Sequence, residues 1–231
     1  MPTPLQPYYQ HAGVTIYHGD CREILPTLPL VALVVTDPPY GMSFRSCYRI
    51  VKHDAIAGDS YLPLDLIELA IAHALRAAYV FCRWDNLSDM PKPRSVLAWV
   101  KNAWSMGDLK HEHGRQWEAC CFYPKEDHEF IKRIPDVIFD NRTGNEMHPT
   151  QKPENLMRIL IQANIGNTVL DPFMGSGTTL LAAKNLGRKA IGIEIEEKYC
   201  EIAAKRLSQE VFDFSAESLP CLVPETSDRH S

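Results

Sequence analysis

Four consecutive residues, Asp37, Pro38, Pro39 and Tyr40, present groups that could act on a planar amine. The Asp37 carboxylate and the Pro38 carbonyl are two acceptors that could hold an exocyclic amine such as adenine N6 and favour a pyramidal nitrogen. The carboxylate would also stabilise the positive charge that develops as this nitrogen attacks, and the Tyr40 ring offers a face for an unstacked base. The plainer interpretation is a strand end followed by a Pro-Pro turn, with Asp37 as an ordinary capping residue.

The element that must position this motif is the apolar run 31–35 directly before it. This run is short, continuous and rich in β-branched residues, which is typical of a strand buried on both faces of a parallel sheet. Two successive prolines cannot donate ladder hydrogen bonds, so the strand must stop at Asp37. The motif is therefore expected at the carboxyl edge of the sheet, where ligands of open α/β sheets bind.

A second motif, from Thr168 to Thr179, joins an apolar strand to a helix through a turn that contains Gly175 and Gly177. Glycines let the backbone approach a ligand closely, and a strand, turn and helix of this kind cradle a cofactor. Glu194 ends the next strand, 19 positions after Gly175, close to the spacing at which such folds hold a ribose hydroxyl. No Gly-Lys-Ser/Thr follows and the third glycine of a dinucleotide motif is missing, so a triphosphate and a dinucleotide are both disfavoured.

Asp20 closes another short strand, 14–18, and two interpretations remain open for it. It could cap the helix that begins at Arg22, or it could hydrogen-bond an amino or hydroxyl group of a ligand. A third cluster, His111-Glu112-His113, invites a zinc interpretation, but no later pair of ligands has the spacing of a site. We therefore expect no metal.

Hydrophobic periodicity predicts an α/β fold with a mostly parallel, twisted sheet and helices on both faces. Beyond the strands already named, strands are expected at 78–82, 96–100, 117–123, 137–139 and 188–193, and helices at 62–77, 153–163, 180–185 and 196–208.

Composition fits a globular protein, with 231 residues, 45% hydrophobic and 23% charged. There is no run of 18 apolar residues and no signal-peptide pattern, so we expect no membrane contact and a cytoplasmic protein. Seven cysteines without Cys-x-x-Cys spacing fit a reducing compartment. The net charge of −5 argues against a positively charged surface that binds nucleic acid nonspecifically. The segment 76–133, however, carries ten Lys/Arg against eight Asp/Glu, a local excess of +2.

Together, the motifs 37–40 and 171–179 resemble those of amino-group DNA methyltransferases, and their order is like that of the β group, a circular permutation. Gly19-Asp20, Trp99-Val-Lys-Asn102 and His148-Pro-Thr-Gln-Lys-Pro153 resemble further family segments. The resemblance implies a Rossmann-like methyltransferase fold, S-adenosylmethionine as cofactor with S-adenosylhomocysteine as product, and no metal or covalent intermediate. It implies a bacterial or phage protein associated with the nucleoid.

Residue by residue, the resemblance implies that Asp37, Pro38, Pro39 and Tyr40 take the flipped base. The implied cofactor set is Asp20, Asp37, Lys152, Asp171, Phe173, Gly175, Ser176, Gly177, Thr178 and Glu194. Within this set Glu194 would hold the ribose, while Ser176, Thr178 and, as a weaker candidate, Lys152 would lie near the cofactor carboxylate.

An Asp before Pro-Pro-Tyr favours adenine N6 over cytosine N4 by family pattern, with double-stranded DNA as the partner. An N4-cytosine or RNA amine methyltransferase keeps the chemistry and changes the substrate, and a catalytically silent DNA-binding module is the alternative of another class. The intact motif at 37–40 argues against the silent module.

The expected organisation is a single methyltransferase domain over 1–210, with a mobile substrate loop at 41–60 and a flexible acidic tail at 211–231. Only the small insertion 103–147 is available for target recognition, which suggests a short or relaxed recognition site, a homodimer, or a partner that reads the DNA.

Overall fold

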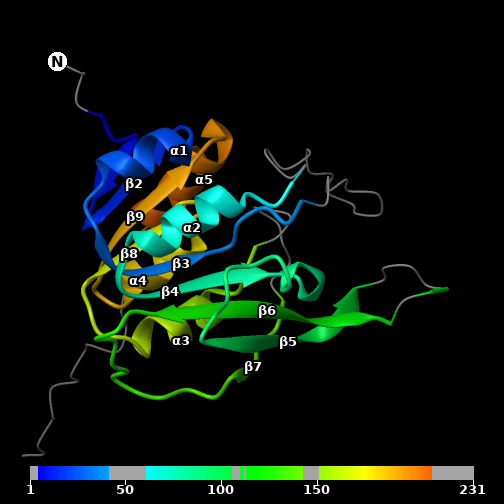
Figure 1. Cartoon of the computed structure of the whole chain (residues 1–231). Helices are drawn as coiled ribbons and strands as arrows, with labels where there is room; N and C mark the ends of the chain where they lie inside the picture. The colour runs from blue at the N-terminus through cyan, green and yellow to red at the C-terminus, as the bar shows by residue number, and fades with distance from the viewer. Residues whose placement is uncertain (1–4, 42–60, 106–109, 112, 143–150, 210–231) are drawn as a thin grey trace, which may run out of the picture.

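The computed structural model describes residues 5–41, 61–105, 110–111, 113–142 and 151–209, and within them nine strands form one sheet (Figure 1). The strands are β1 (Tyr9–His11), β2 (Val14–His18), β3 (Val31–Thr36), β4 (Ala74–Cys82), β5 (Ser95–Ser105), β6 (Arg115–Pro124), β7 (Val137–Phe139), β8 (Thr168–Asp171) and β9 (Lys189–Glu194). Their order across the sheet is β1-β2-β9-β8-β3-β4-β6-β5-β7.

The strands in the middle of the sheet are parallel, and the direction in which successive strands are added reverses between β8 and β3. Strands β9, β8, β3 and β4 pair in parallel, whereas β6 runs antiparallel between β4 and β5. From β8 the chain crosses over to β9 on one side, and from β3 it crosses over to β4 on the other. Ligands of open α/β sheets bind at the carboxyl ends of the strands at such a reversal. The ends of β8 and β3 are therefore the place to look for a site.

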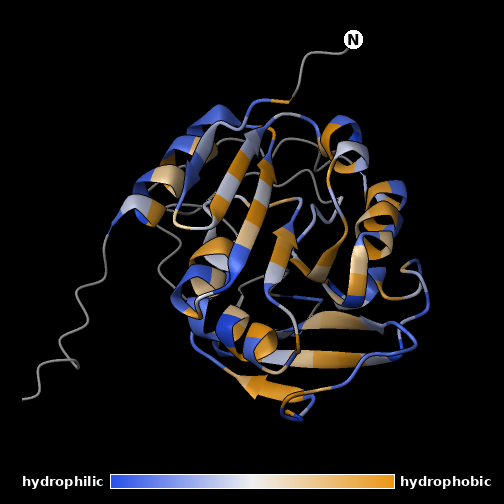
Figure 2. Cartoon of the chain, turned by 90° about the vertical axis from the view of Figure 1, so that its left-hand side faces the viewer, coloured by the Kyte–Doolittle hydropathy of each residue, from blue (hydrophilic) through white to orange (hydrophobic). Residues whose placement is uncertain are grey.

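Helices cover both faces of this sheet, as expected. Helices α1 (Cys21–Ile24) and α2 (Leu64–Ala72) pack on one face, and α3 (Glu154–Gln162), α4 (Thr178–Asn185) and α5 (Glu197–Ser208) pack on the other. Short 3-10 helices η1 (Leu25–Thr27) and η2 (Trp84–Asn86) complete the described elements. Successive strand side chains point to opposite faces, so Leu33 and Val35 join one buried cluster and Val34 joins the other. Figure 2 shows the strands rich in hydrophobic residues and the helices with mixed faces.

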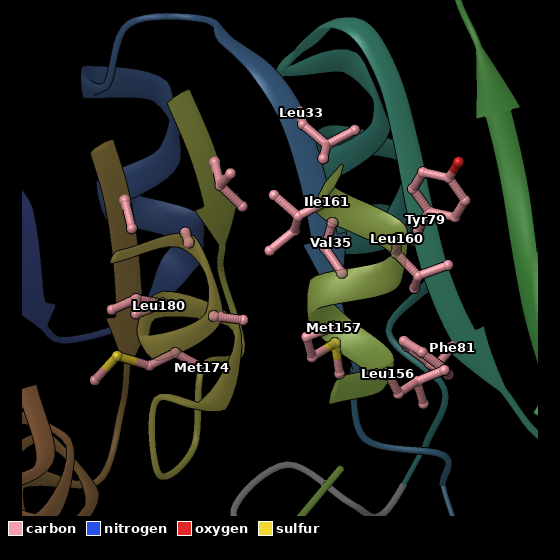
Figure 3. Packing of buried hydrophobic residues seen from close by; sticks show 14 of the residues in the cluster. Leu33, Val35, Tyr79, Phe81, Leu156, Met157, Leu160, Ile161, Met174 and Leu180 are labelled. Carbon is pink, nitrogen blue, oxygen red and sulfur yellow. The ribbon is translucent and has the colours of Figure 1, made fainter. Parts of the chain in front are cut away.

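Helix α3 is held by four side chains that point toward β3 and β4 (Figure 3). They are Leu156, Met157, Leu160 and Ile161, each exposed by 2% or less. Their spacing forms one apolar stripe on the helix. Because α3 begins directly after Pro153, this packing also helps to fix the position of Lys152, whose ammonium contacts Asp37 after the end of β3.

Helix α2 ends earlier than the predicted helix 62–77, which corrects that prediction. His73 closes the helix, because its two ring nitrogens lie 3.0 Å from the Leu69 carbonyl oxygen and 2.7 Å from the Leu25 carbonyl oxygen. The alanine-rich stretch that follows forms β4 in the middle of the sheet. Alanine favours helices locally, and packing in the sheet outweighs that preference here.

The range 103–147, predicted for target recognition, contains part of the main sheet. Strand β6 pairs with β4 over 119–124, and β5 continues to Ser105, beyond its predicted end at 100. Figure 1 shows the hairpin of β5 and β6 projecting past the end of β4. The role of this range in target recognition stays a prediction.

Several predicted features fall on residues that the structure does not describe. The substrate loop 41–60 lies outside the described residues except for Gly41, and so does the whole acidic tail 211–231. The assignment of 1–210 to a single domain stays a prediction. Among the described residues, the helices are too short or too polar to cross a membrane.

Candidate functional site

Four acidic residues lie at or next to the carboxyl ends of four neighbouring strands. Asp20 follows β2, Glu194 ends β9, Asp171 ends β8 and Asp37 follows β3. Their order in the chain is 20, 37, 171, 194, whereas the strand order across the sheet makes it 20, 194, 171, 37. The sheet thus brings together the two motifs predicted to act on the base and to bind the cofactor.

Hydrogen bonds at the end of β3 hold Asp37 and Tyr40 in place. The Tyr40 hydroxyl donates to Asp37 Oδ1 at 2.5 Å, and the Tyr40 carbonyl oxygen accepts from the Asn86 side-chain amide at 3.0 Å. Thr36, the last residue of β3, donates its hydroxyl to an Asp171 oxygen at 2.7 Å. This last bond ties β3 directly to β8, the strand that leads into the glycine turn.

Asp37 belongs to a buried cluster of alternating charges that we call the charge cluster, made of Asp37, Lys152, Glu118 and Lys101. Lys152 Nζ contacts Asp37 Oδ2 and lies 3.1 Å from Glu118 Oε2, while Lys101 Nζ contacts Glu118 Oε1. Lys152 also donates to the Tyr40 hydroxyl at 3.1 Å. The Lys152 and Lys101 side chains are exposed by only 4% and 8%. These residues come from the end of β3, the start of α3, and strands β6 and β5.

Burial and the neighbouring charges act against each other on the pKa values of the charge cluster. Burial raises the pKa of Asp37, and the Lys152 ammonium opposes this effect. Burial alone would raise the pKa of Glu118, but the two ammonium groups outweigh it and lower the pKa to about 2. Burial would lower the pKa of Lys152, but its two carboxylates raise it. Burial and the charge of Asp37 raise the pKa of Tyr40 well above its ordinary value, so the phenol stays a donor.

Neutral hydrogen-bond donors surround Asp171 and Glu194, the two acids next to the glycine turn. Asp171 accepts from Thr36 and from the backbone N–H of Phe173 at 3.1 Å. Glu194 accepts from the backbone N–H groups of Gly175 at 3.0 Å and Glu196 at 2.9 Å. Burial raises the pKa of Asp171 to about 6 and that of Glu194 to about 7.

Helix α5 braces the glycine turn from behind. Arg206 donates to the Ser176 carbonyl oxygen at 2.6 Å, and its Nη1 lies 3.2 Å from Ser176 Oγ and 3.4 Å from Thr178 Oγ1. Gly177 has φ +78°, and a Cβ built there would lie 2.8 Å from the Cβ of Ala203. Gly177 therefore allows α5 to pack closely against the turn, whereas the sequence predicted only a close approach to a ligand.

Asp20 caps α1, which confirms one of its two interpretations. Its carboxylate accepts from the Arg22 backbone N–H at 2.8 Å and from the Arg22 guanidinium at 3.2 Å. Arg22 also donates to the Tyr61 hydroxyl at 2.5 Å. A ligand-binding role for Asp20 stays a prediction.

The structure brings most of the predicted site residues to one edge of the sheet, at the carboxyl ends of its strands. Lys152 has a different partner from the predicted one. Asp171, Phe173, Gly175, Ser176, Gly177 and Thr178 share one turn, which Glu194 joins through its bond to Gly175. Lys152 contacts Asp37, and its predicted place beside the cofactor carboxylate stays untested. Glu118 and Arg206 were not predicted as site residues, and Lys101 entered only as part of the segment 99–102. Opposite charges near the facing ends of two predicted strands were a further signal for Lys101 and Glu118.

Comparisons with known proteins agree with this geometry. The DNA methylase family N6_N4_Mtase matches residues 93–205. The type II methyltransferase M2.LlaDCHI of Lactococcus lactis subsp. cremoris is 53% identical over 88% of this chain and 93% of that protein. The DNA adenine methyltransferase YhdJ of Escherichia coli (strain K12) is 28% identical over 89% of this chain and 86% of that protein.

Solved structures share the fold. The crystal structure of an M1.HpyAVI–SAM complex has a TM-score of 0.65 at 27% identity, covering 84% of this chain and 99% of that chain. The PvuII DNA methyltransferase (cytosine-N4-specific) has a TM-score of 0.66, and the match covers 89% of this chain and 90% of that chain. At 17% identity, this match shows the fold alone. The resemblance and the Rossmann-like fold expected from the sequence are confirmed, and this chain belongs to the amino-group DNA methyltransferase family.

Proposed function

We propose that this chain is a site-specific methyltransferase that moves a methyl group from S-adenosylmethionine to adenine N6 in double-stranded DNA. The observation that carries the proposal is the union of the two motifs at adjacent strand ends. Asp37, Pro38 and Tyr40 lie after β3, and the Thr36–Asp171 hydrogen bond joins them to the glycine turn after β8. An acceptor for an amine thus lies beside a turn suited to a cofactor.

The residues at the ends of β8 and β9 fit S-adenosylmethionine. This cofactor is a sulfonium cation, and when bound it supplies an electrophilic methyl group. The described hydrogen-bond donors to Asp171 and Glu194 are neutral, so the two carboxyl groups offer uncompensated negative charge to a cation. We assign the ribose to Glu194, the adenosine end to Asp20 and Phe173, and the methionine end to the turn 175–178.

The base is handled by the motif after β3. An adenine extruded from the duplex would lie on the Tyr40 ring, and stacking offsets part of the few kcal/mol that base flipping costs. The Asp37 carboxylate and the Pro38 carbonyl would accept the two N6 hydrogens. As N6 attacks, positive charge develops on it, and the fixed Asp37 carboxylate stabilises this charge more than it stabilises the neutral amine.

Adenine is preferred over cytosine for two reasons. An acid rather than a serine precedes Pro-Pro-Tyr, and the relative YhdJ is named as a DNA adenine methyltransferase. Cytosine N4 remains the second candidate, since the cytosine-N4-specific PvuII enzyme shares the fold. Target recognition is assigned to the described parts of 103–147, and the chain would act in the bacterial cytoplasm as a monomer or homodimer.

Long-read modification mapping of DNA from cells that express this chain tests the proposal. We expect N6-methyladenine at one short motif, and about 100- to 1,000-fold less with Asp37→Asn, since that change removes the fixed charge at the reacting amine. Isothermal titration with S-adenosylhomocysteine should give similar affinities for both proteins. Glu201→Gln is the matched control, because it removes an exposed carboxylate that pairs with Lys205 on α5, and it should leave methylation unchanged.

Each alternative has its own outcome. N4-methylcytosine in place of N6-methyladenine would refute the choice of base and keep the chemistry. Cofactor binding without methylation of DNA or RNA would favour the silent DNA-binding module. Equal methylation by the parent and Asp37→Asn would refute the role of Asp37.

A further inference from the structure

The Lys152 ammonium lies between two carboxylates in the charge cluster. It contacts Asp37 Oδ2 and lies 3.1 Å from Glu118 Oε2. Glu118 belongs to β6, where it pairs with Trp99 of β5, and neither strand is part of the motif 37–40. One cation is therefore shared between Asp37 and an acid from β6, a strand two positions away from β3 in the sheet.

Asp37 cannot serve the ammonium and the reacting amine equally well. Its Oδ1 accepts from the Tyr40 hydroxyl and its Oδ2 from Lys152. A cation on Oδ2 neutralises the charge that should stabilise the attacking nitrogen, and it also repels the positive charge that develops there. Withdrawal of Lys152 from Asp37 would remove both effects.

Withdrawal requires another carboxylate, because Lys152 is almost entirely shielded from water in this position. Its side chain is 4% exposed, and Nζ lies 5.2 Å from the centre of the Phe81 ring and 5.9 Å from that of Trp99. An unpaired ammonium in such surroundings is strongly disfavoured. Glu118 is already within reach, so only a small displacement is needed.

Lys101 holds Glu118 ready for this role. It contacts Glu118 Oε1, which leaves Oε2 toward Lys152 and toward the Tyr40 hydroxyl at 3.4 Å. The Lys101 Nζ also lies 5.1 Å from the centre of the Trp99 ring on the same strand, and this contact helps to hold the lysine side chain in place. With a pKa lowered to about 2 by the two ammonium groups against the effect of burial, Glu118 stays charged at any working pH.

We propose that Glu118 is a positioning residue that receives the Lys152 ammonium when the target amine engages Asp37. The inference rests on the proposed function, since it assumes that Asp37 accepts the amine. Asp37 touches the substrate, whereas Glu118 acts through Lys152.

A double-mutant cycle on thermal stability tests the shared ammonium without any need for activity. Asp37→Asn and Glu118→Gln each leave Lys152 one carboxylate, so each should lower the melting temperature modestly. The double variant leaves none, and its melting temperature should fall about 5 °C further than the sum of the single effects. The loss of the Lys101 partner occurs in both Glu118→Gln proteins and cancels. Additive effects would overturn the proposal.

A third substitution keeps the cycle informative if the double variant does not fold. Lys152→Met removes the unpaired ammonium, so Asp37→Asn/Glu118→Gln/Lys152→Met should fold again. Failure of this rescue, with both single variants folded, would show that the ammonium is not the cause and would overturn the proposal.

Single-turnover transfer of labelled methyl groups to total DNA tests the catalytic consequence. Glu118→Gln should slow transfer about 10- to 100-fold, with KM for DNA and cofactor affinity within about twofold of the parent. The deficit should persist in Glu118→Gln/Lys101→Met, where no unpaired Lys101 remains, whereas a purely structural role predicts recovery. A normal rate in Glu118→Gln, together with an inactive Asp37→Asn, would refute the positioning role of Glu118 and leave the proposed role of Asp37 intact. An inactive parent would refute the proposed function, and the stability cycle would then decide on Glu118.

Discussion

Replacement of Glu194 by glutamine should make the stability of this protein less sensitive to pH. Burial raises the pKa of Glu194 to about 7 from the ordinary value of 4.5. Between these values the folded state binds more protons than the unfolded state, so stability falls as pH rises through the window. Above pH 7 the folded protein carries the full cost of an ionised, part-buried carboxylate.

The size of this cost follows from the two pKa values. They differ by 7 − 4.5 = 2.5 units, and each unit is worth about 1.4 kcal/mol, so the loss is at most about 3.5 kcal/mol. For a chain of this size that corresponds to a shift of at most about 7–14 °C in melting temperature. Glutamine cannot ionise, and its weaker bonds to Gly175 and Glu196 cost the same at every pH.

Thermal unfolding of the parent and Glu194→Gln between pH 5 and pH 8 is the assay. We expect the difference in melting temperature to move in favour of glutamine as pH rises, whatever its sign at pH 5. The titration of Asp171 occurs in both proteins, so most of its contribution is common to the two curves. Two parallel curves would show that Glu194 titrates normally and would refute the assignment of its raised pKa to burial.

The same substitution tests the cofactor assignment. An ionised Glu194 is the form that accepts hydrogen bonds from a ribose, so affinity of the parent for S-adenosylhomocysteine should rise from pH 5.5 to pH 8. Glu194→Gln should bind about 10-fold more weakly at pH 8, with little dependence on pH, since a charged acceptor is lost. Equal affinity of the two proteins at pH 8 would remove Glu194 from the ribose site.

Two further changes probe the glycine turn. Gly177→Ala places a Cβ 2.8 Å from that of Ala203, at φ +78°. It should lower the free energy of unfolding, measured with denaturant, by about 2–4 kcal/mol. Gly187→Ala is the control, because Gly187 has a similar φ of +68° but open space around it, and it should lower this free energy by only about 1 kcal/mol. Equal costs would show that the contact with α5 is unimportant. Arg206→Met removes the brace on Ser176 and should weaken cofactor binding about 10-fold in isothermal titration, and unchanged binding would mean that the turn keeps its shape without the brace.

Much of the site could be predicted because its signals are local. Strand β3 and the prolines after it are contiguous, and so are β8 and its glycine turn. The structure has β8 at 168–171 and β9 ending at Glu194, as expected. The parallel pairing of Leu33 with Val169 then places the two motifs side by side, a relation that follows from the general rule on sheet edges.

The parts that escaped prediction depend on contacts between distant elements. Glu118 begins a run of small and aromatic residues and looks like the exposed end of a strand. Only the antiparallel pairing of β6 with both β4 and β5 carries it toward Asp37. Arg206 sits in the last turn of α5, where a basic residue is expected on general grounds, and nothing local points to the turn at Ser176. The early end of α2 likewise depends on the contact of His73 with Leu25.

The acids along the sheet edge divide into two kinds according to their partners. The described donors to Asp171 and Glu194 are hydroxyl and backbone N–H groups, which hold a carboxylate in place but do not cancel its charge, and their pKa values are accordingly raised. Asp37 has an ammonium partner, whose attraction opposes the effect of burial. In the proposed function, the acids without an ionic partner attract the cationic cofactor, whereas Asp37 exchanges its ammonium partner for the substrate amine. The sheet order would then separate these two electrostatic tasks by a single strand step, from β8 to β3, and would place cation binding next to amine activation.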